Sequence, residues 1–304
     1  MPNIPACNLP APAHYLYSIT YTYIMSKYFA VLLLASCFLL PASAAIVDTV
    51  RISYPDPAGN KTYPCVVIRP DAYDSADSLQ RYPAVYLLHG YSGNAYNWIS
   101  KVPALKDYAD QYQVLIVCPD GGFSSWYFDS PVDSTMRYET YIGHTVPSYI
   151  DSAYRTIADR SGRAITGLSM GGHGGLFLGF RHSSFFGACG SMSGGVNLLP
   201  FQSKYDIAKR LGSPAKYPAH WKKYAVLEMI EQKPADSLAI IIDCGTEDFF
   251  YADNKALHEK LLQLKITHDY IERGGGHNWA YWENAVSYQL LFFHRYFVQQ
   301  ARTS

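Results

Sequence analysis

Five short apolar runs, in which apolar and polar residues do not alternate, constrain the possible fold most strongly. They are Ala84–Leu88, Val114–Cys118, Ala164–Thr166, Ala188–Ser191 and Leu238–Ile242. Strands that are apolar on both faces are typical of a parallel sheet with helices on either side. The helices that we expect between and after the runs are Ala95–Tyr108, Tyr138–Tyr154, Gly172–Arg181, Asp253–Leu264 and Trp279–Gln299. The alternation predicts an α/β fold with a mostly parallel, doubly wound sheet.

Two segments depart from this alternation. Val47–Tyr54 and Tyr63–Arg69 each alternate and are joined by the turn-rich Pro55–Asn60, which predicts an N-terminal antiparallel hairpin. Residues 197–235 carry four prolines and scattered lysines, and we expect them to form a small helical cap insertion. Because 49% of the 304 residues are hydrophobic, the chain can bury one large core, and we expect a single domain over residues 45–304.

The first 44 residues have the pattern of a leader. The apolar run Tyr28–Leu40 is too short to cross a bilayer comfortably, and Pro41–Ala44 offers a cleavage site before Ala45. We therefore expect an upstream extension, then a signal peptide starting at Met25, and export to the periplasm or the extracellular space. No membrane association is expected once the leader is removed. The alternatives are a retained membrane anchor and a lipoprotein anchored at Cys37, whose preceding residues resemble a lipobox.

Charge and composition narrow the possible partners. The net charge is +0 and the isoelectric point is about 7.1, so nothing predicts binding to nucleic acid. No metal-ligand spacing is found, so we expect neither a metal nor a cofactor, and the sequence carries no signal for an oligomeric state. We expect the cysteines after the leader to be small buried hydrophobic residues, with one disulfide left open. These cysteines are Cys65, Cys118, Cys189 and Cys244.

The segment Gly167–Gly171, Gly-Leu-Ser-Met-Gly, follows the third apolar run and precedes an expected helix. In that context it predicts a nucleophile elbow, a turn so sharp that Ser169 must adopt a strained backbone conformation. Side chains two residues before and after the serine would collide, so glycine is needed at both positions. The hydroxyl of Ser169 would then be exposed, and the amide of Met170 would face the space where an oxyanion forms.

Two residues at strand ends would complete a catalytic triad with this serine. Asp248 follows the last of the five runs, and His277 lies on a glycine-rich loop after a further expected strand, Thr267–Glu272. Functional groups gather at the carboxyl ends of strands in such a sheet. The order Ser, Asp, His is that of α/β-hydrolases, in which histidine takes the serine proton and aspartate orients the imidazole. The competing candidates are Asp243 and Glu247 for the acid, and His258 and His294 in expected helices and His268 in the expected strand for the base.

The segment Leu87–Gly93, Leu-Leu-His-Gly-Tyr-Ser-Gly, follows the first apolar run. Its position predicts that the amide of Tyr91 supplies the second donor of an oxyanion hole, beside that of Met170. We expect His89 to support this loop by hydrogen bonding, and His173, in the expected elbow helix, to be structural.

Four stretches together resemble the esterase D branch of the α/β-hydrolases. They are Gly167–Gly174, Leu87–Gly93, Cys244–Phe249 and Gly275–Trp282. The resemblance covers roughly residues 46 to 300 and implies the α/β-hydrolase fold, with Ser169, Asp248 and His277 as triad. It also implies an oxyanion hole at Tyr91 and Met170. The branch includes S-formylglutathione hydrolases, tributyrin, feruloyl and acetylxylan esterases, and mycolyltransferases.

The resemblance implies a serine esterase that forms an acyl-enzyme without a cofactor. Expected export disfavours a cytosolic glutathione ester and favours acetyl or feruloyl esters on carbohydrate. We expect Trp126, Tyr127 and Trp279 to contact this substrate, and Trp98 and Trp282 to support the core. The alternatives are acyl transfer to a sugar hydroxyl, a thioesterase like the S-formylglutathione hydrolases, and an inactive carbohydrate-binding relative.

Overall fold

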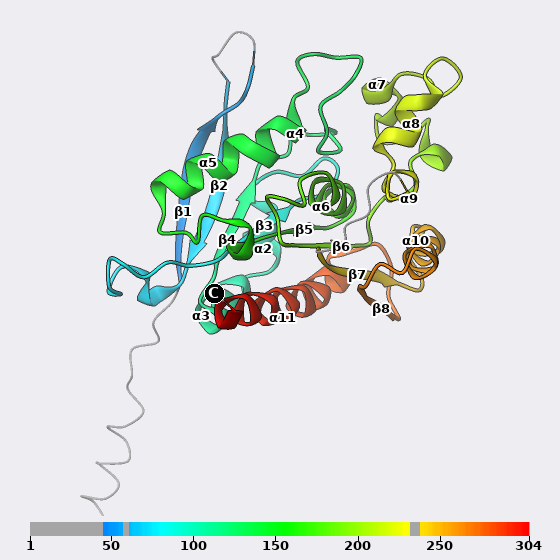
Figure 1. The fold of residues 1–304 in the computed structure, drawn as a ribbon. Helices are drawn as coiled ribbons and strands as arrows, with labels where there is room; N and C mark the ends of the chain where they lie inside the picture. Colours follow the sequence, from blue (N-terminus) through cyan, green and yellow to red (C-terminus); the bar gives the residue numbers. More distant parts are fainter. Residues whose placement is uncertain (1–44, 57–60, 232–237, 304) are drawn as a thin grey trace, which may run out of the picture. The chain divides into compact units, whose positions relative to one another are not determined.

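An eight-stranded sheet organises the part of the chain that this computed structural model describes, residues 45–56, 61–231 and 238–303 (Figure 1). The strand order is β1-β2-β4-β3-β5-β6-β7-β8. β1 and β2 are antiparallel, β2 pairs antiparallel with β4, and the remaining neighbours are parallel. The strands are β1 Ile46–Ser53, β2 Thr62–Arg69, β3 Ala84–Leu88, β4 Leu115–Pro119, β5 Arg163–Gly167, β6 Ala188–Met192, β7 Ala239–Gly245 and β8 Asp269–Arg273. The predicted α/β-hydrolase fold with its N-terminal hairpin is confirmed.

The central strands are apolar on both faces, and the structure buries them completely. Every residue of β3, β4, β5 and β6 is buried. In β1, at the edge of the sheet, exposed residues alternate with half-buried ones and with the buried Ile52. Helices α5 (Val146–Ala153) and α6 (Met170–Arg181) lie on one face, and α3 (Leu105–Tyr112) and α11 (Trp279–Thr303) lie on the other (Figure 1). Helix α10 (Tyr251–Gln263) follows β7 and also packs on the α6 side.

Two expected helices are interrupted in the structure. The segment predicted as Ala95–Tyr108 forms α2 (Asn97–Lys101) and then α3, because Pro103 disfavours a helical conformation at the residue before it. The segment predicted as Tyr138–Tyr154 begins with α4 (Tyr138–Thr140), continues as a five-residue π-helical turn and ends with α5. Pro147 has no N–H for the carbonyl of Gly143, so a regular α-helical bond is missing where the wider turn occurs.

Residues 197–231 form the insertion between β6 and β7 that the sequence predicts, and residues 232–235 of that prediction lie outside the described residues. Its short helices are η4 Leu199–Phe201, α7 Ile207–Leu211, α8 Pro218–Tyr224 and α9 Val226–Met229. Four side chains of the sheet domain bond to main-chain carbonyls of the insertion: Trp126 to Tyr205, Ser130 to Arg210, His173 to Tyr224 and Lys260 to Leu227. These four bonds hold the backbone of the insertion near α6 and α10. Its side chains add further contacts, because Arg210 donates to Ser124, Asn197 donates to Asp253, and apolar residues such as Ile207 and Trp221 are buried in the core.

The predicted leader, with its start at Met25 and the alternative anchor at Cys37, lies outside the described residues. Ala45, where the predicted mature chain begins, is buried, and its main-chain nitrogen donates to Asp110 Oδ2 at 3.1 Å. Among the helices described here, none is both long and apolar enough to span a bilayer.

The cysteines of the described chain are packing residues. Cys65, Cys118, Cys189 and Cys244 are all buried and free, so the open possibility of a disulfide among them is not realised. Burial raises the pKa of each thiol above its ordinary value.

Candidate active site

The turn between β5 and α6 has the geometry of a nucleophile elbow. Ser169, at the N-cap of α6, has φ 55° and ψ −114°, a backbone conformation that residues other than glycine rarely adopt. A Cβ atom on Gly167 would lie 2.6 Å from the carbonyl oxygen of Leu88, and one on Gly171 would lie 2.5 Å from the same atom. Glycine is therefore required on both sides of the serine, as the motif predicts, and the half-buried serine faces the cavity described below.

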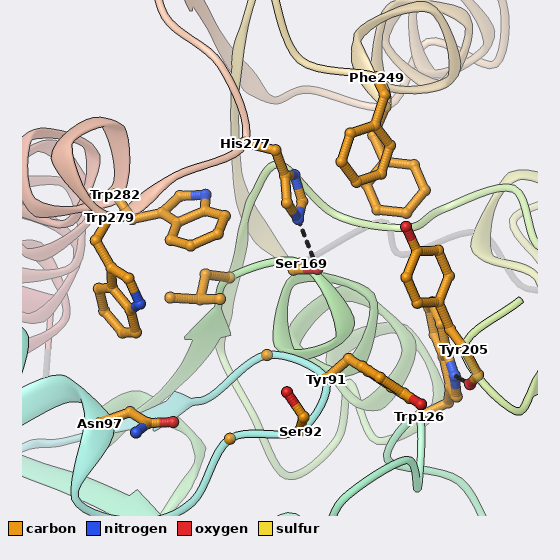
Figure 2. Close-up of a pocket in the computed structure, with 14 residues that line it drawn as sticks. Tyr91, Ser92, Asn97, Trp126, Ser169, Tyr205, Phe249, His277, Trp279 and Trp282 are labelled. Carbon is orange, nitrogen blue, oxygen red and sulfur yellow. Dashed lines mark hydrogen bonds between the residues drawn. The ribbon is translucent and has the colours of Figure 1, made fainter.

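Three side chains from three strand ends meet at this serine. His277, after β8, has its Nε2 2.9 Å from Ser169 Oγ (Figure 2). Its Nδ1 lies 2.8 and 3.0 Å from the two carboxylate oxygens of Asp248, which follows β7. The carboxylate is fully buried, whereas 15% of the histidine side chain is exposed. The structure thus brings together the three residues selected from the sequence, in the geometry that a serine nucleophile and its base require.

Neighbouring groups fix the positions of the acid and the base. The carboxylate of Asp248 accepts the main-chain N–H of Phe250 at 2.8 Å. The His277 ring lies 4.3 Å from the ring of Phe249 and 4.8 Å from that of Trp282, measured between centroids. The imidazole is therefore packed between one aromatic ring from the turn after β7 and one from helix α11, which restricts its rotation.

The competing candidates lie elsewhere in the structure. Asp243 is fully buried inside β7, and Glu247 is exposed. His258 lies in α10 and His294 in α11, as expected. His268 was expected inside a strand, and this is wrong: it comes just before β8 and its Nε2 lies 2.7 Å from His258 Nδ1. None of these five residues is hydrogen-bonded to Ser169 or lines its cavity.

Two backbone amides are left free beside the serine. Within the described part of the chain, no hydrogen bond is formed by the amide of Tyr91 or by that of Met170, the first residue of α6. The loop of Tyr91 is fixed by its neighbours, because Ser92 N donates to Phe123 O at 2.7 Å. Both amides are thus available for the predicted oxyanion hole, and the N-terminus of α6 adds a favourable dipole for negative charge.

His89 supports this loop from inside the core, as the sequence predicts. Its Nδ1 donates to the Gly90 carbonyl at 2.8 Å, and its Nε2 accepts the amide of Gly121 at 2.7 Å. Burial lowers the pKa of His89, which keeps the ring in the neutral form that these two bonds require. His173 is also structural: it is buried in α6, and burial lowers its pKa to about 4.

A cavity of about 450 Å³ opens at the serine. Trp126 and Trp279, for which the sequence predicts contact with the substrate, line this cavity. Trp282, which was expected only to support the core, lines it as well. Trp98 is a core residue, as expected, and its Nε1 donates to Leu88 O at 3.0 Å. The complete lining is Gly90, Tyr91, Ser92, Gly93, Asn97, Trp126, Leu168, Ser169, Tyr205, Phe249, Phe250, His277, Trp279 and Trp282 (Figure 2).

Tyr127 does not have the position that the sequence suggested. It is fully buried and absent from the cavity lining, and its hydroxyl donates to the carbonyl of His89 at 2.8 Å. Trp126 and Tyr127 both have positive φ, 55° and 61°, and this backbone conformation sends only Trp126 to the cavity wall. Tyr127 instead supports the loop that carries Tyr91.

Several cavity residues were not found from the sequence. Phe249 and Phe250 follow the acid directly, and that adjacency was an available signal. Tyr205 comes from the insertion and Asn97 from α2, and neither belongs to a recognisable motif. No cluster of potential metal ligands occurs among the described residues.

An ion pair stabilises the two strand ends that carry the acid and the base. Arg273 Nη2 lies 2.6 Å from Oδ2 of the buried Asp243, and the hydroxyl of Tyr281 donates to Oδ1 of the same carboxylate at 2.5 Å. Asp243 lies in β7 before Asp248, and Arg273 ends β8 before His277. This group of three residues, which we call the brace, thus joins the strands that position two members of the site.

Comparisons with known proteins find an esterase family and several esterases and acyltransferases similar to this chain. A model of the family described as "Putative esterase" matches residues 58–293. An acetyl esterase of Caldicellulosiruptor saccharolyticus is 25% identical over 67% of this chain and 80% of its own. The diacylglycerol acyltransferase/mycolyltransferase Ag85A of Mycobacterium bovis is 27% identical over 66% of this chain and 69% of its own. The solved structure of a ferulic acid esterase is 30% identical, covers 83% of this chain and 98% of its own, and has a TM-score of 0.70.

Proposed function

The chain belongs to the esterase family whose model it matches, and we propose that it is an exported serine esterase that acts through an acyl-enzyme on Ser169. Its substrates are acetyl or feruloyl esters of carbohydrate. The observation that carries the proposal is the contact of Ser169 Oγ with His277 Nε2 at 2.9 Å, with Asp248 on the opposite ring nitrogen.

The reaction follows from these contacts. Ser169 Oγ attacks the ester carbonyl carbon while its proton passes to His277 Nε2. The amides of Tyr91 and Met170 stabilise the resulting oxyanion. When the tetrahedral intermediate collapses, the C–O bond to the alcohol breaks and His277 returns the proton to the leaving oxygen. A water molecule then attacks the acyl-enzyme by the same route and releases the carboxylic acid and free Ser169.

The substrate class is supported by the cavity and by two relatives. The described cavity lining contains neither lysine nor arginine, and it is rich in aromatic rings. A glutathione ester would bring carboxylates that find no cation there, so the cavity does not favour the thioesterase alternative. Neutral sugars and phenolic rings suit such walls. The similar acetyl esterase and ferulic acid esterase act, by their names, on the two ester types proposed here.

Acyl transfer is a second candidate function, favoured by the similarity to a mycobacterial acyltransferase. The same acyl-enzyme serves both reactions, and the acceptor of the acyl group separates them. Hydrolysis predicts that free acid forms at a rate unaffected by added sugar. Transfer predicts that a sugar acceptor accelerates release of the alcohol and becomes acylated.

Export is proposed from the leader sequence. The main-chain nitrogen of Ala45 contacts the carboxylate of Asp110, so cleavage before Ala45 would place a new ammonium group beside a carboxylate. Intact-mass analysis of the protein from its native envelope tests this. A chain that begins at Ala45 is expected, and a lipid-modified chain beginning at Cys37 would contradict it.

The enzyme proposal is tested with Ser169→Ala in the purified domain, using acetylated and feruloylated sugars and p-nitrophenyl acetate. Turnover should fall by on the order of 10⁴ to 10⁶, because the nucleophile is removed. A fluorophosphonate should add its mass to the wild type and not to the variant. Near-normal turnover in a variant with an unchanged melting temperature would refute the assignment of the nucleophile.

A further inference from the structure

Five aromatic residues form a continuous row along one side of the cavity mouth, and we call this row the aromatic rim. In spatial order they are Phe123, Tyr91, Tyr205, Phe201 and Phe249. Successive ring centroids are 5.0, 5.4, 6.3 and 6.3 Å apart. The last ring, Phe249, lies 4.3 Å from the ring of His277. The rim therefore leads from the protein surface to the catalytic base.

Large apolar side chains in and beside the rim are exposed, although side chains of this kind are usually buried. Phe123 is 60% exposed and Phe249 is 52% exposed, and Leu199, two residues before Phe201, is 51% exposed. Phe123 and Phe249 lie at the two ends of the rim, and the three rings between them are half-buried, so the rim is a row of partly exposed apolar rings of the kind that marks an interaction site. Tyr205 is held in place because its carbonyl accepts Trp126 Nε1 at 3.0 Å, and Figure 2 shows its ring between Trp126 and Phe249.

The chemistry of the rim indicates a neutral ligand with both apolar faces and hydroxyl groups. Its members are rings, which offer flat stacking surfaces, and none of them is charged. The hydroxyls of Tyr91 and Tyr205 form no hydrogen bond with any described residue. A long acyl chain would leave these hydroxyls unpaired, whereas a sugar supplies C–H faces for the rings and hydroxyls for the phenols.

We infer that the aromatic rim binds the carbohydrate part of an extended sugar ester, beyond the sugar that carries the ester. This inference rests on the proposed esterase function and adds that the enzyme prefers oligosaccharide esters over monosaccharide esters. The position of the rim also assigns the two halves of the ester. His277 must protonate the leaving alcohol, so the alcohol lies beside the base, where the rim ends at Phe249.

The test compares one acyl group carried on a monosaccharide, on an oligosaccharide of the same sugar, and on p-nitrophenol. In the wild type, kcat/KM should rise from the monosaccharide to the oligosaccharide. Phe123→Ala should raise KM for the oligosaccharide ester about two- to tenfold at unchanged kcat, because one stacking partner is lost. Phe123 does not line the cavity, so its loss should not affect p-nitrophenyl acetate. Leu79→Ala, which removes an 80% exposed side chain outside the rim, is the matched control and should change nothing.

Phe123→Leu separates stacking from general apolar contact, because it keeps an apolar side chain and removes the ring face. It should behave like Phe123→Ala. Sugar-ester activity without dependence on chain length, or an equal loss on all substrates in Phe123→Ala, overturns the rim inference and leaves the esterase proposal standing. A loss confined to long-chain p-nitrophenyl esters would assign the rim to the acyl chain and also overturn it. If the wild type cleaves p-nitrophenyl acetate and no sugar ester, the carbohydrate part of the proposed function fails as well.

Discussion

Removing the cation of the brace should destabilise the protein strongly for a single substitution near the surface. In Arg273→Gln, the fully buried Asp243 carboxylate keeps the hydroxyl of Tyr281 and loses its counter-charge. Losing one partner of a buried pair costs about 3–5 kcal/mol, and we reduce this to about 2–3 kcal/mol because 23% of the Arg273 side chain is exposed. For a domain of this size the melting temperature should fall by about 4–12 °C.

Two further variants separate the loss of the positive charge from the loss of the other contacts that Arg273 makes. Nη2 holds the carboxylate, and Nε has no hydrogen-bond partner among the described residues, so Arg273→Lys should retain most of the stability. The double variant Arg273→Gln, Asp243→Asn should be more stable than Arg273→Gln alone, because the buried position then needs no counter-charge. With Asp243→Asn alone measured as well, the four proteins form a double-mutant cycle, which gives the coupling energy between Arg273 and Asp243.

The loss of melting temperature in Arg273→Gln should be larger at high pH than at low pH. Burial raises the pKa of Asp243, while Tyr281 and Arg273 act to lower it. Loss of Arg273 therefore raises this pKa further, and the folded variant binds a proton more readily than the folded wild type does. The gap in melting temperature should be largest at high pH and should shrink as the pH falls through the raised pKa of the variant. Calorimetric melts from pH 8 to pH 5 measure it. A gap that is constant with pH, or a lysine variant as unstable as the glutamine variant, would refute the reasoning.

Two further predictions concern backbone contacts and thiols. Gly171→Ala should sharply reduce soluble yield and activity, because the new Cβ would lie 2.5 Å from the Leu88 carbonyl oxygen. Gly274→Ala is the control and should be tolerated, because the nearest atom to its Cβ would be in Glu247, at 4.0 Å. Equal yield and activity of the two variants would count against the steric argument. The native domain should not react with Ellman's reagent, because burial raises the pKa of all four thiols, and rapid labelling without denaturant would contradict this.

The buried strands, the elbow and the triad residues could be predicted from the sequence, because local sequence patterns determine them. Apolar runs located the buried strands, and the strand-to-turn-to-helix context of Ser169 located the elbow. Asp248 and His277 could be selected because parallel strands end at one edge of the sheet, which limits the candidates to residues just after a strand. These assignments required no knowledge of side-chain packing.

The residues that the sequence placed wrongly or missed depend on tertiary structure. Trp126 faces the cavity and Tyr127 faces the core because both residues have positive φ angles. No sequence motif predicts these angles. Tyr205 reaches the cavity only because the insertion folds back over the strand ends. The brace between Asp243 and Arg273 joins strands whose pairing register had to be known first.

The attachment of the insertion has a consequence for how related enzymes can diverge. Four side chains of the sheet domain hold the insertion by its main-chain carbonyls, which every amino acid provides. Substitutions in the insertion can therefore accumulate without loosening these four anchors. Since Tyr205 and Phe201 belong to this segment, the sugar contacts that we propose for the aromatic rim can change while the elbow, the acid and the base keep their positions.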